Sequence, residues 1–208
     1  INTIDNEGTI CFDGRAKVCF FTRCPRENKK SLGCEIWTAE LAGTKWKNVK
    51  KLDLKNNDSL SIGHPCVTAD GKFLIFAGNL PGGQGGKDLW FSEYNRRQKA
   101  WGTPVNMGPE INTKGNELFP TLGPDGNLYI ASDGHPGMGG LDMFVCAKAG
   151  TNKWGKPANL QAPLNSSSND YGIIPTDAKH GYFTSNRPHR GKNGKSHKPD
   201  IWSYELPP

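Results

Sequence analysis

Long hydrophobic runs are missing from this chain of 208 residues. No apolar stretch approaches the ~20 residues that a helix needs to cross a bilayer. No segment keeps the i, i+3, i+4, i+7 apolar spacing of an amphipathic helix for more than one turn. The sequence therefore predicts neither a helical bundle nor direct insertion of this domain into a membrane.

The usual short signals of metal, cofactor and nucleotide sites are also missing. The six cysteines form no CxxC pair and have no metal-ligand spacing with histidine. The run from Gly191 to Ser196 resembles a phosphate loop, but that motif requires glycine at position 189, which is His189. The other histidines, His64, His135, His180 and His197, do not recur in register and are expected at the surface or in caps. We predict no cofactor and no metal.

What the chain has instead is internal repetition. The ends of four apolar runs lie 55, 54 and 53 residues apart, at Phe21, Phe76, Ile130 and Phe183. An acidic residue followed by an aliphatic and an aromatic one recurs with a similar period, beginning at Glu35, Asp88, Asp142 and Asp200. A tryptophan follows nine to eleven residues after the aromatic residue of the first three of these triplets, at Trp46, Trp101 and Trp154. A period near 50 is typical of propeller arrays.

Within one repeat the local signals are those of strands. Residues 119–123 lead to a Pro124-Asp125-Gly126 turn, and a short apolar run follows, which reads as a hairpin. We therefore predict an all-β fold, a β-propeller of four-stranded antiparallel blades that stack on one another. The predicted single domain covers residues 1–208, with repeats of roughly 1–56, 57–110, 111–163 and 164–208.

The prominent acids also repeat, which argues against an asymmetric catalytic centre. We expect Glu35, Asp88, Asp142 and Asp200, and the turn residues Asp70 and Asp125, to bond local backbone amides. Glu7, Glu117 and Asp170 precede the first strand in three repeats and are predicted to line one end of the axial channel. A glycosidase would need two such carboxylates about 5 to 9.5 Å apart, so a glycan-cleaving or glycan-binding propeller stays open as an alternative.

Cysteine placement suggests one disulfide. Cys24 and Cys34 bracket a loop of the first repeat, and Cys11 and Cys19 flank its first hairpin turn, so either pair is suitably placed for a bridge. Of the two pairs we single out Cys24–Cys34, and free, half-buried thiols are the alternative. Cys66 and Cys146 have no obvious partner, which argues against a full disulfide framework.

Positive charge gathers at the two ends of the sequence. Residues 1–56 hold 11 basic and 7 acidic side chains, and residues 179–208 hold 6 and 2, although the net charge of the whole chain is only +6. No nucleic-acid motif accompanies the charge, so we expect no nucleic-acid partner. The last repeat has the longest basic loop, and we predict partner contacts there, at Arg187, His189, Arg190, Lys192 and Lys195.

Several phrases carry a family resemblance. The turn with Asp-Gly before an apolar run, followed by a glycine-rich loop and Gly-Gly-x-Asp-aliphatic-aromatic, resembles the TolB-type WD40-like repeat known as PD40. The longer phrases at residues 63–73, 115–120, 132–144 and 183–188 resemble the propeller of Bacteroidetes OmpA-family outer-membrane lipoproteins. The first repeat departs from the pattern by a longer turn at residues 13–17, and the last by its basic loop.

The resemblance implies a non-catalytic interaction platform rather than an enzyme. It implies a periplasmic place in an outer-membrane-associated assembly, such as the type IX secretion system, with other secretion-system or envelope proteins as partners. In such parents peptidoglycan is held by a separate domain that has no counterpart here, and the propeller has five blades. Because the chain starts at Ile1 rather than Met and has no signal peptide, we expect it to be a piece of a longer protein. A passive structural spacer is the second alternative.

Overall fold

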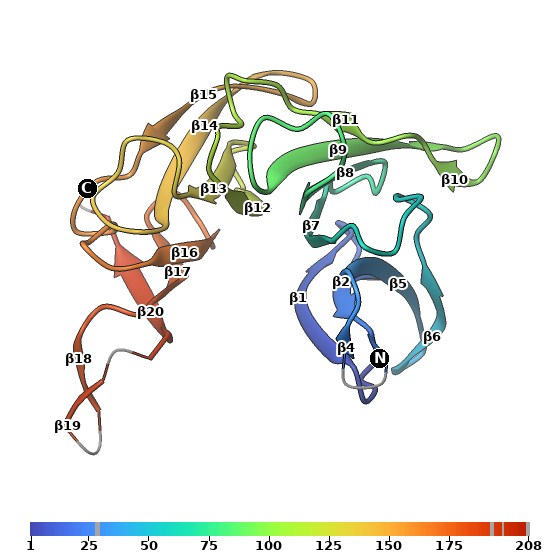
Figure 1. Ribbon diagram of the computed structural model, residues 1–208, viewed down its shortest axis with the longest axis horizontal. Coiled ribbons are helices and arrows are strands. Elements are labelled where there is room, and N and C mark those ends of the chain that lie inside the picture. The colour runs from blue at the N-terminus through green and yellow to red at the C-terminus, as the bar shows by residue number, and fades with distance from the viewer. Residues whose placement is uncertain (28–29, 192–193, 197, 207–208) are drawn as a thin grey trace. The chain divides into compact units, whose positions relative to one another are not determined.

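The computed structural model describes residues 1–27, 30–191, 194–196 and 198–206 (Figure 1). These described residues form strands, turns and bends, and none of them is helical. Among them there is accordingly no helix long and apolar enough to cross a membrane. The all-β prediction is confirmed.

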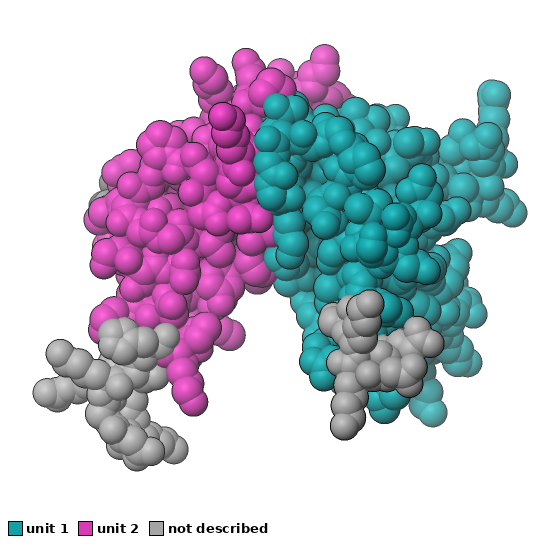
Figure 2. Space-filling model, viewed as in Figure 1, with its two compact units in different colours: residues 1–108 teal, residues 109–208 magenta. Residues whose placement is uncertain are grey.

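The chain divides into two compact units, Ile1–Gly108 and Pro109–Pro208, which Figure 2 shows in teal and magenta. The division falls between the second and third sequence repeats, so each unit contains two of them. Each unit is described below by itself. Treatment of residues 1–208 as a single domain stays a prediction.

Unit 1 holds two antiparallel sheets, which we call blades 1 and 2. Blade 1 has the order β1-β2-β5-β6, and in blade 2 the path runs β7-β8-β9, with both β10 and β11 paired on β9. The strands of blade 1 are β1 (Asn6–Phe12), β2 (Val18–Cys24), β5 (Glu35–Ala42) and β6 (Lys45–Lys51). Those of blade 2 are β7 (Ile62–Val67), β8 (Phe73–Gly78), β9 (Asp88–Asn95), β10 (Ala100–Trp101) and β11 (Val105–Asn106). A short pair, β3 (Arg26–Glu27) and β4 (Lys30–Ser31), lies in the loop after β2.

Unit 2 holds blades 3 and 4. Blade 3 has the order β12-β13-β14-β15, whereas blade 4 has only three strands, β16-β17-β20. The strands of blade 3 are β12 (Glu117–Leu122), β13 (Leu128–Ser132), β14 (Asp142–Gly150) and β15 (Lys153–Asn159). Those of blade 4 are β16 (Asp170–Pro175), β17 (His180–Ser185) and β20 (Asp200–Glu205), and a separate hairpin of β18 (His189–Gly191) and β19 (Gly194–Ser196) joins the last two.

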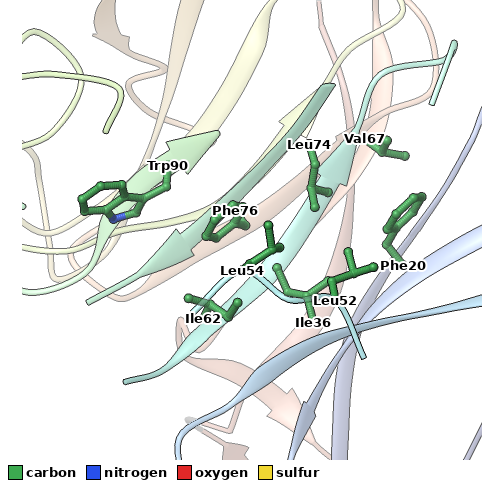
Figure 3. Close-up of a cluster of buried hydrophobic side chains, with 9 residues drawn as sticks. All are labelled: Phe20, Ile36, Leu52, Leu54, Ile62, Val67, Leu74, Phe76 and Trp90. Carbon is green, nitrogen blue, oxygen red and sulfur yellow. The ribbon is translucent and has the colours of Figure 1, made fainter. Parts of the chain in front are cut away.

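The blades of one unit are held together by apolar side chains on facing sheets. In unit 1 the cluster in Figure 3 joins Phe20 and Ile36 of blade 1 to Ile62, Leu74 and other buried residues of blade 2. In unit 2, Met143 of blade 3 packs with Ile173 and Phe183 of blade 4. Because side chains alternate along a strand, the apolar ones lie on one face of each sheet. Two neighbouring sheets can therefore bury apolar faces that neither sheet could bury alone.

The first strand of every blade carries an irregularity at the same repeat position. Thr9, His64 and Phe119 have positive φ angles of 30°, 52° and 51°, and in blade 4 the matching residue is Gly172, with φ 64°. The strand register shifts across each of these residues. A β-bulge re-aims the side chain that it carries, and a non-glycine residue with positive φ is strained unless its surroundings fix it.

Candidate functional sites

The three acids predicted at a channel mouth have a shared local structure. Each accepts two hydrogen bonds, from the backbone N–H and the hydroxyl of the residue four positions earlier in the linker. Thr113 donates to Glu117 at 2.9 and 2.6 Å, and Ser166 donates to Asp170 at 2.7 and 2.7 Å. Thr3 donates to Glu7 at 3.1 and 2.7 Å. Glu117 and Asp170 are fully buried, so neither carboxylate faces solvent, and only Glu7 lines a cavity.

Two of these acids form ion pairs with arginines. The sequence analysis predicted Arg187 as a partner contact and did not single out Arg23. Arg23 Nε lies 3.1 Å from Glu7 Oε1, and its Nη2 donates to the Ile1 carbonyl at 2.6 Å. Arg187 Nη2 lies 2.7 Å from Asp170 Oδ1 and donates to the Leu164 carbonyl at 2.5 Å. Both guanidinium groups also lie over two aromatic rings of their own blade. Arg187, predicted as a partner contact, is therefore directed into blade 4.

His135 performs the same task in blade 3. Its Nε2 lies 2.8 Å from the carbonyl oxygen of Ile111 and donates to it, and its ring packs on Phe144 at a centroid distance of 5.3 Å. Ile1, Ile111 and Leu164 are equivalent, because each opens an Ile/Leu-Asn-Ser/Thr phrase of a linker. We call Arg23, His135 and Arg187 the linker braces. They come from different positions of their repeats, so repetition alone could not reveal them, although the shared linker phrase was a signal.

The remaining repeated acids mostly bond local backbone amides, as predicted. Asp88 accepts hydrogen bonds from Gln84 N at 2.5 Å and Gly85 N at 3.2 Å, and Asp142 from Met138 N and Gly139 N. The turn acids Asp70 and Asp125 and the strand acid Asp200 behave likewise. Glu35 differs, because it accepts a hydrogen bond from Trp37 Nε1 and forms an ion pair with Lys51, whose Nζ lies 3.1 Å from Glu35 Oε1.

The basic loop of the last repeat is only partly described. Arg190 pairs with Lys195, and His189 with Ser196, across the β18–β19 hairpin. Lys192 lies outside the described residues. The structure therefore places the backbone of His189, Arg190 and Lys195 together on one hairpin, separate from the sheet of blade 4.

The cysteines are structural. Cys24 and Cys34 form a disulfide that closes the loop containing β3 and β4, with their Cα atoms 4.0 Å apart. The other four cysteines form no disulfide, and burial raises the pKa of Cys11 well above its ordinary value and that of Cys146 to about 12. Burial is also the main cause of the raised pKa of Cys19. Thiols held in the protonated form are poor nucleophiles.

A small cavity lies beside the bulges of unit 1. It has a volume of about 210 Å³ and is lined by Glu7, Thr9, Thr22, His64 and Lys87, together with the disulfide. The Thr22 hydroxyl lies 2.7 Å from that of Thr9 and accepts from His64 N at 2.9 Å. Burial, with a smaller effect of Lys87, lowers the pKa of His64 from 6.5 to about 4. His64 is therefore a neutral imidazole at physiological pH.

A larger groove lies between blades 1 and 2, with a volume of about 460 Å³. Its floor includes Phe20 and Trp101, whose rings meet edge to face at 5.8 Å, and Tyr94, whose ring centroid is 5.4 Å from that of Trp101. Its rim carries charges of both signs, including Asp53 and Lys99. An aromatic floor inside a polar rim suits a neutral polar ligand.

The corresponding groove of unit 2, between blades 3 and 4, has a volume of about 500 Å³. Tyr129, Ile173, Tyr204 and Leu206 line it, and Asp125 and Asp177 stand among its lining residues. Burial and then Asp125 raise the pKa of Tyr129 to about 12, and burial followed by Asp177 raises that of Tyr204. No lysine or arginine is among the lining residues that the structure describes.

No group of three or more histidine, cysteine or acidic side chains is placed to hold a metal ion within the described parts of the chain. The candidate sites are concave surfaces, among them the two grooves and the bulge cavity. All three are concave and built from ordinary side chains, and each is suited to binding. The candidate carboxylates Glu117 and Asp170 belong to none of them.

No family model matches the sequence, and no curated protein matches it. Solved structures do. TolB from Acinetobacter baumannii superposes with a TM-score of 0.59 at 13% identity, covering 99% of this chain and 42% of that one. A Hadza microbial sialidase gives 0.54 at 12% identity, over 96% of this chain and 43% of that one. A thermostable family-43 glycoside hydrolase gives 0.52 at 12% identity, over 93% and 69%.

The fold is a TolB-like β-propeller. At these identities the likeness extends to the fold alone, and the neighbours include TolB as well as two glycan-cleaving proteins. The chain spans less than half the length of TolB and of the sialidase. A shared fold does not imply a shared function.

Proposed function

We propose that this propeller is a non-catalytic interaction platform in a bacterial cell envelope. The proposal rests on one observation: the three acids that could serve a catalytic centre are already held by hydrogen bonds and ion pairs within the chain. Glu7 and Asp170 are each held by an arginine and a linker residue, and Glu117 by Thr113 and Ser132. A glycosidase needs one carboxyl to meet the leaving group and another to meet water or the sugar, whereas these acids are occupied with holding their own linkers.

The proposed location is the periplasm. The Cys24–Cys34 disulfide supports it, because disulfides persist in oxidising compartments such as the bacterial periplasm. The TolB-like fold and the sequence phrases shared with OmpA-family lipoproteins support it too. In this proposal a longer parent protein associates the propeller with the outer membrane, within a type IX secretion or cell-wall-anchored complex. Peptidoglycan is then contacted by a separate domain.

The proposed contact surface for envelope proteins is the loop with the β18–β19 hairpin. It concentrates Arg190, Lys192 and Lys195 in six residues, and loops on a rigid scaffold are where binding residues vary most freely. Arg187 is left out of this surface because its charge is paired with Asp170 inside the blade.

The test is crosslinking followed by pull-down from cell-envelope fractions. A variant with Arg190, Lys192 and Lys195 changed to serine is compared with the native chain, and Arg187 is kept because it braces the fold. The matched control changes three exposed lysines elsewhere, Lys45, Lys47 and Lys156. We expect a discrete partner protein that the loop variant loses and the control keeps. Capture of no partner would support a passive spacer instead.

Glycan binding is the second candidate, and the groove of unit 1 favours it. Trp101 and Tyr94 offer ring faces beside carboxylates and lysines, the combination with which proteins hold sugar rings. A glycan array probed with the native chain and with Trp101→Ala would decide. Saturable binding to one glycan class that the variant loses would replace the platform proposal.

A further inference from the structure

The bulge cavity of unit 1 is lined by one acidic and one basic side chain. Glu7 is the acid and Lys87 is the base, and no other aspartate, glutamate, lysine or arginine is among the lining residues that the structure describes. His64 lines the cavity as well, and burial lowers its pKa to about 4, so its ring is neutral. The cavity therefore combines one negative and one positive group with neutral polar ones.

Glu7 has one carboxylate oxygen left for a ligand. The three hydrogen bonds that its side chain accepts all go to Oε1, from Thr3 N at 3.1 Å, Thr3 Oγ1 at 2.7 Å and Arg23 Nε at 3.1 Å. Oε2 accepts none from the described residues, although each carboxylate oxygen is an acceptor. Both oxygens of Glu117 and both of Asp170 are engaged. Of these three acids, Glu7 is therefore the one that can offer an oxygen to a ligand in a cavity.

Hydroxyl groups of the cavity supply hydrogen-bond donors. Ser61 Oγ accepts a hydrogen bond from Cys34 N at 3.0 Å, and the Ser61 hydroxyl donates to no acceptor among the described residues. The Thr9 and Thr22 hydroxyls lie 2.7 Å apart, so one donates to the other and one proton remains available. Together with the Lys87 ammonium group, these donors suit a carboxylate, because hydrogen bonds to an ionised acceptor are the strong ones.

The walls of the cavity are fixed by close packing and by a covalent bond. The Cys24–Cys34 disulfide is part of the lining. A Cβ added at Gly63 would lie 2.9 Å from Thr22 Cγ2, so glycine lets β7 approach β2 closely there. A Cβ added at Gly8 would meet nothing within 4 Å, so the space beside Gly8 is open. A preformed site spends less of the binding free energy on ordering itself.

The size and the lining of the cavity restrict its ligand. Its volume of about 210 Å³ is below the ~300–1,000 Å³ of pockets that hold drug-sized molecules. No phenylalanine, tyrosine or tryptophan is among the lining residues in the described chain, in contrast to the aromatic floor of the larger groove of unit 1. The cavity therefore fits a small, charged molecule better than a sugar ring.

We propose that the bulge cavity of unit 1 binds a free α-amino acid, whose ammonium group donates to Glu7 Oε2 and whose carboxylate accepts hydrogen bonds from Lys87 and Ser61. A molecule with both charges satisfies both ends of the cavity, whereas a simple anion or a simple amine satisfies only one. This small-molecule site goes beyond the interaction role proposed above. It is built from unit 1 alone and does not depend on the β18–β19 hairpin.

The experiment titrates the 208-residue chain with L-alanine at pH 7 by isothermal titration calorimetry. The matched probes are propionate, which lacks the ammonium group, and ethylammonium, which lacks the carboxylate. We expect saturable binding of L-alanine. We expect each of the other two probes to bind at least about tenfold more weakly, because each lacks one of the two charged hydrogen-bonding ends.

Two variants locate the site. Lys87→Gln removes the positive charge of the cavity, and Lys47→Gln is the matched control, because Lys47 is also exposed but does not line the cavity. We expect the first to weaken L-alanine binding about tenfold and the second to leave it unchanged. Gly8→Leu extends a side chain into the open space and should abolish binding. Urea unfolding checks that each variant folds, and the comparison of the two lysine variants decides if Gly8→Leu does not.

Propionate that binds as tightly as L-alanine would overturn the proposal by showing a simple anion site, and equally tight ethylammonium would overturn it by showing a simple cation site. Equal affinity of the native chain and Lys87→Gln for L-alanine, or no saturable binding of L-alanine, would overturn it as well. None of these outcomes bears on the crosslinking result for the hairpin variant, so the two proposals fail separately.

Discussion

The two units place the same backbone device in different chemical surroundings. In unit 1 the bulged first strands present Thr9 and His64, which lie in a cavity with Glu7 and Lys87. In unit 2 the same positions are Phe119 and Gly172, and Phe119 stacks on Tyr171 at a centroid distance of 4.8 Å. One unit thus offers a polar, titratable pocket where the other offers stacked aromatic rings.

The difference teaches that the repeat conserves a backbone conformation and leaves its side chain free. Positive φ at a non-glycine residue costs about 1–2 kcal/mol, yet three of the four blades accept that cost. The bulge therefore serves the path of the strand in every blade, while the side chain that it re-aims gives each unit its own chemical surroundings.

The linker braces give the largest expected difference between blades. Arg23 and Arg187 pair with acids that are largely buried, whereas His135 donates a hydrogen bond to a backbone carbonyl. Loss of one partner from a buried ion pair costs about 3 kcal/mol or more. Loss of a single neutral hydrogen bond costs about 1 kcal/mol. Arg187→Ala should therefore lower the free energy of unfolding by about 3 kcal/mol, and His135→Ala by about 1 kcal/mol.

Urea unfolding of Arg23→Ala, Arg187→Ala and His135→Ala measures this contrast, with Arg97→Ala as an exposed control. Arg187→Lys should recover only part of the loss, because lysine has no planar fork to reach Asp170 and the Leu164 carbonyl together. Equal losses in all three blades would mean that the braces act as hydrogen bonds alone and that charge is immaterial.

These braces also mark the limit of what the sequence could predict. The strands, blade repeats and turn acids follow from local patterns, since alternation, Asp-Gly turns and repeated aromatic residues act within a few positions. The partner of Glu7 is Arg23 and that of Asp170 is Arg187, 16 and 17 residues away, and the two arginines occupy different positions in their repeats. Such contacts depend on which side chain reaches a site in three dimensions, which no period encodes.

The bulge cavity of unit 1 should make stability depend on pH. The pKa of His64 is about 4 in the folded chain, below its ordinary value of 6.5, because burial and Lys87 disfavour the charged ring. Below about pH 6.5 the unfolded chain binds a proton that the folded chain does not. The contribution of His64 to stability should therefore fall by about 3 kcal/mol as the pH drops from about 6.5 to about 4, and His64 should contribute no slope above that range.

His64→Asn tests this, because asparagine tolerates a positive φ and does not titrate. Urea unfolding between pH 4 and 8 should show a smaller loss of stability at low pH for the variant than for the native chain. Phe119→Asn, at the matching position of unit 2, should leave the slope unchanged. The same change of slope in both variants would mean that the pH response is not a property of the unit 1 cavity.

The smallest expected effect is at the one glycine among the four bulges. Gly172 has φ 64°, and a Cβ added there would come no nearer than 3.8 Å to the Thr184 hydroxyl, so space is available. Gly172→Ala should cost about 1 kcal/mol through the backbone alone, and Gly172→Asn less, because asparagine enters this region more readily. Gly8→Ala is the matched control, since an added Cβ meets nothing within 4 Å there. If the two alanine variants are equally stable by urea unfolding, the bulge of blade 4 does not require a left-handed conformation at residue 172.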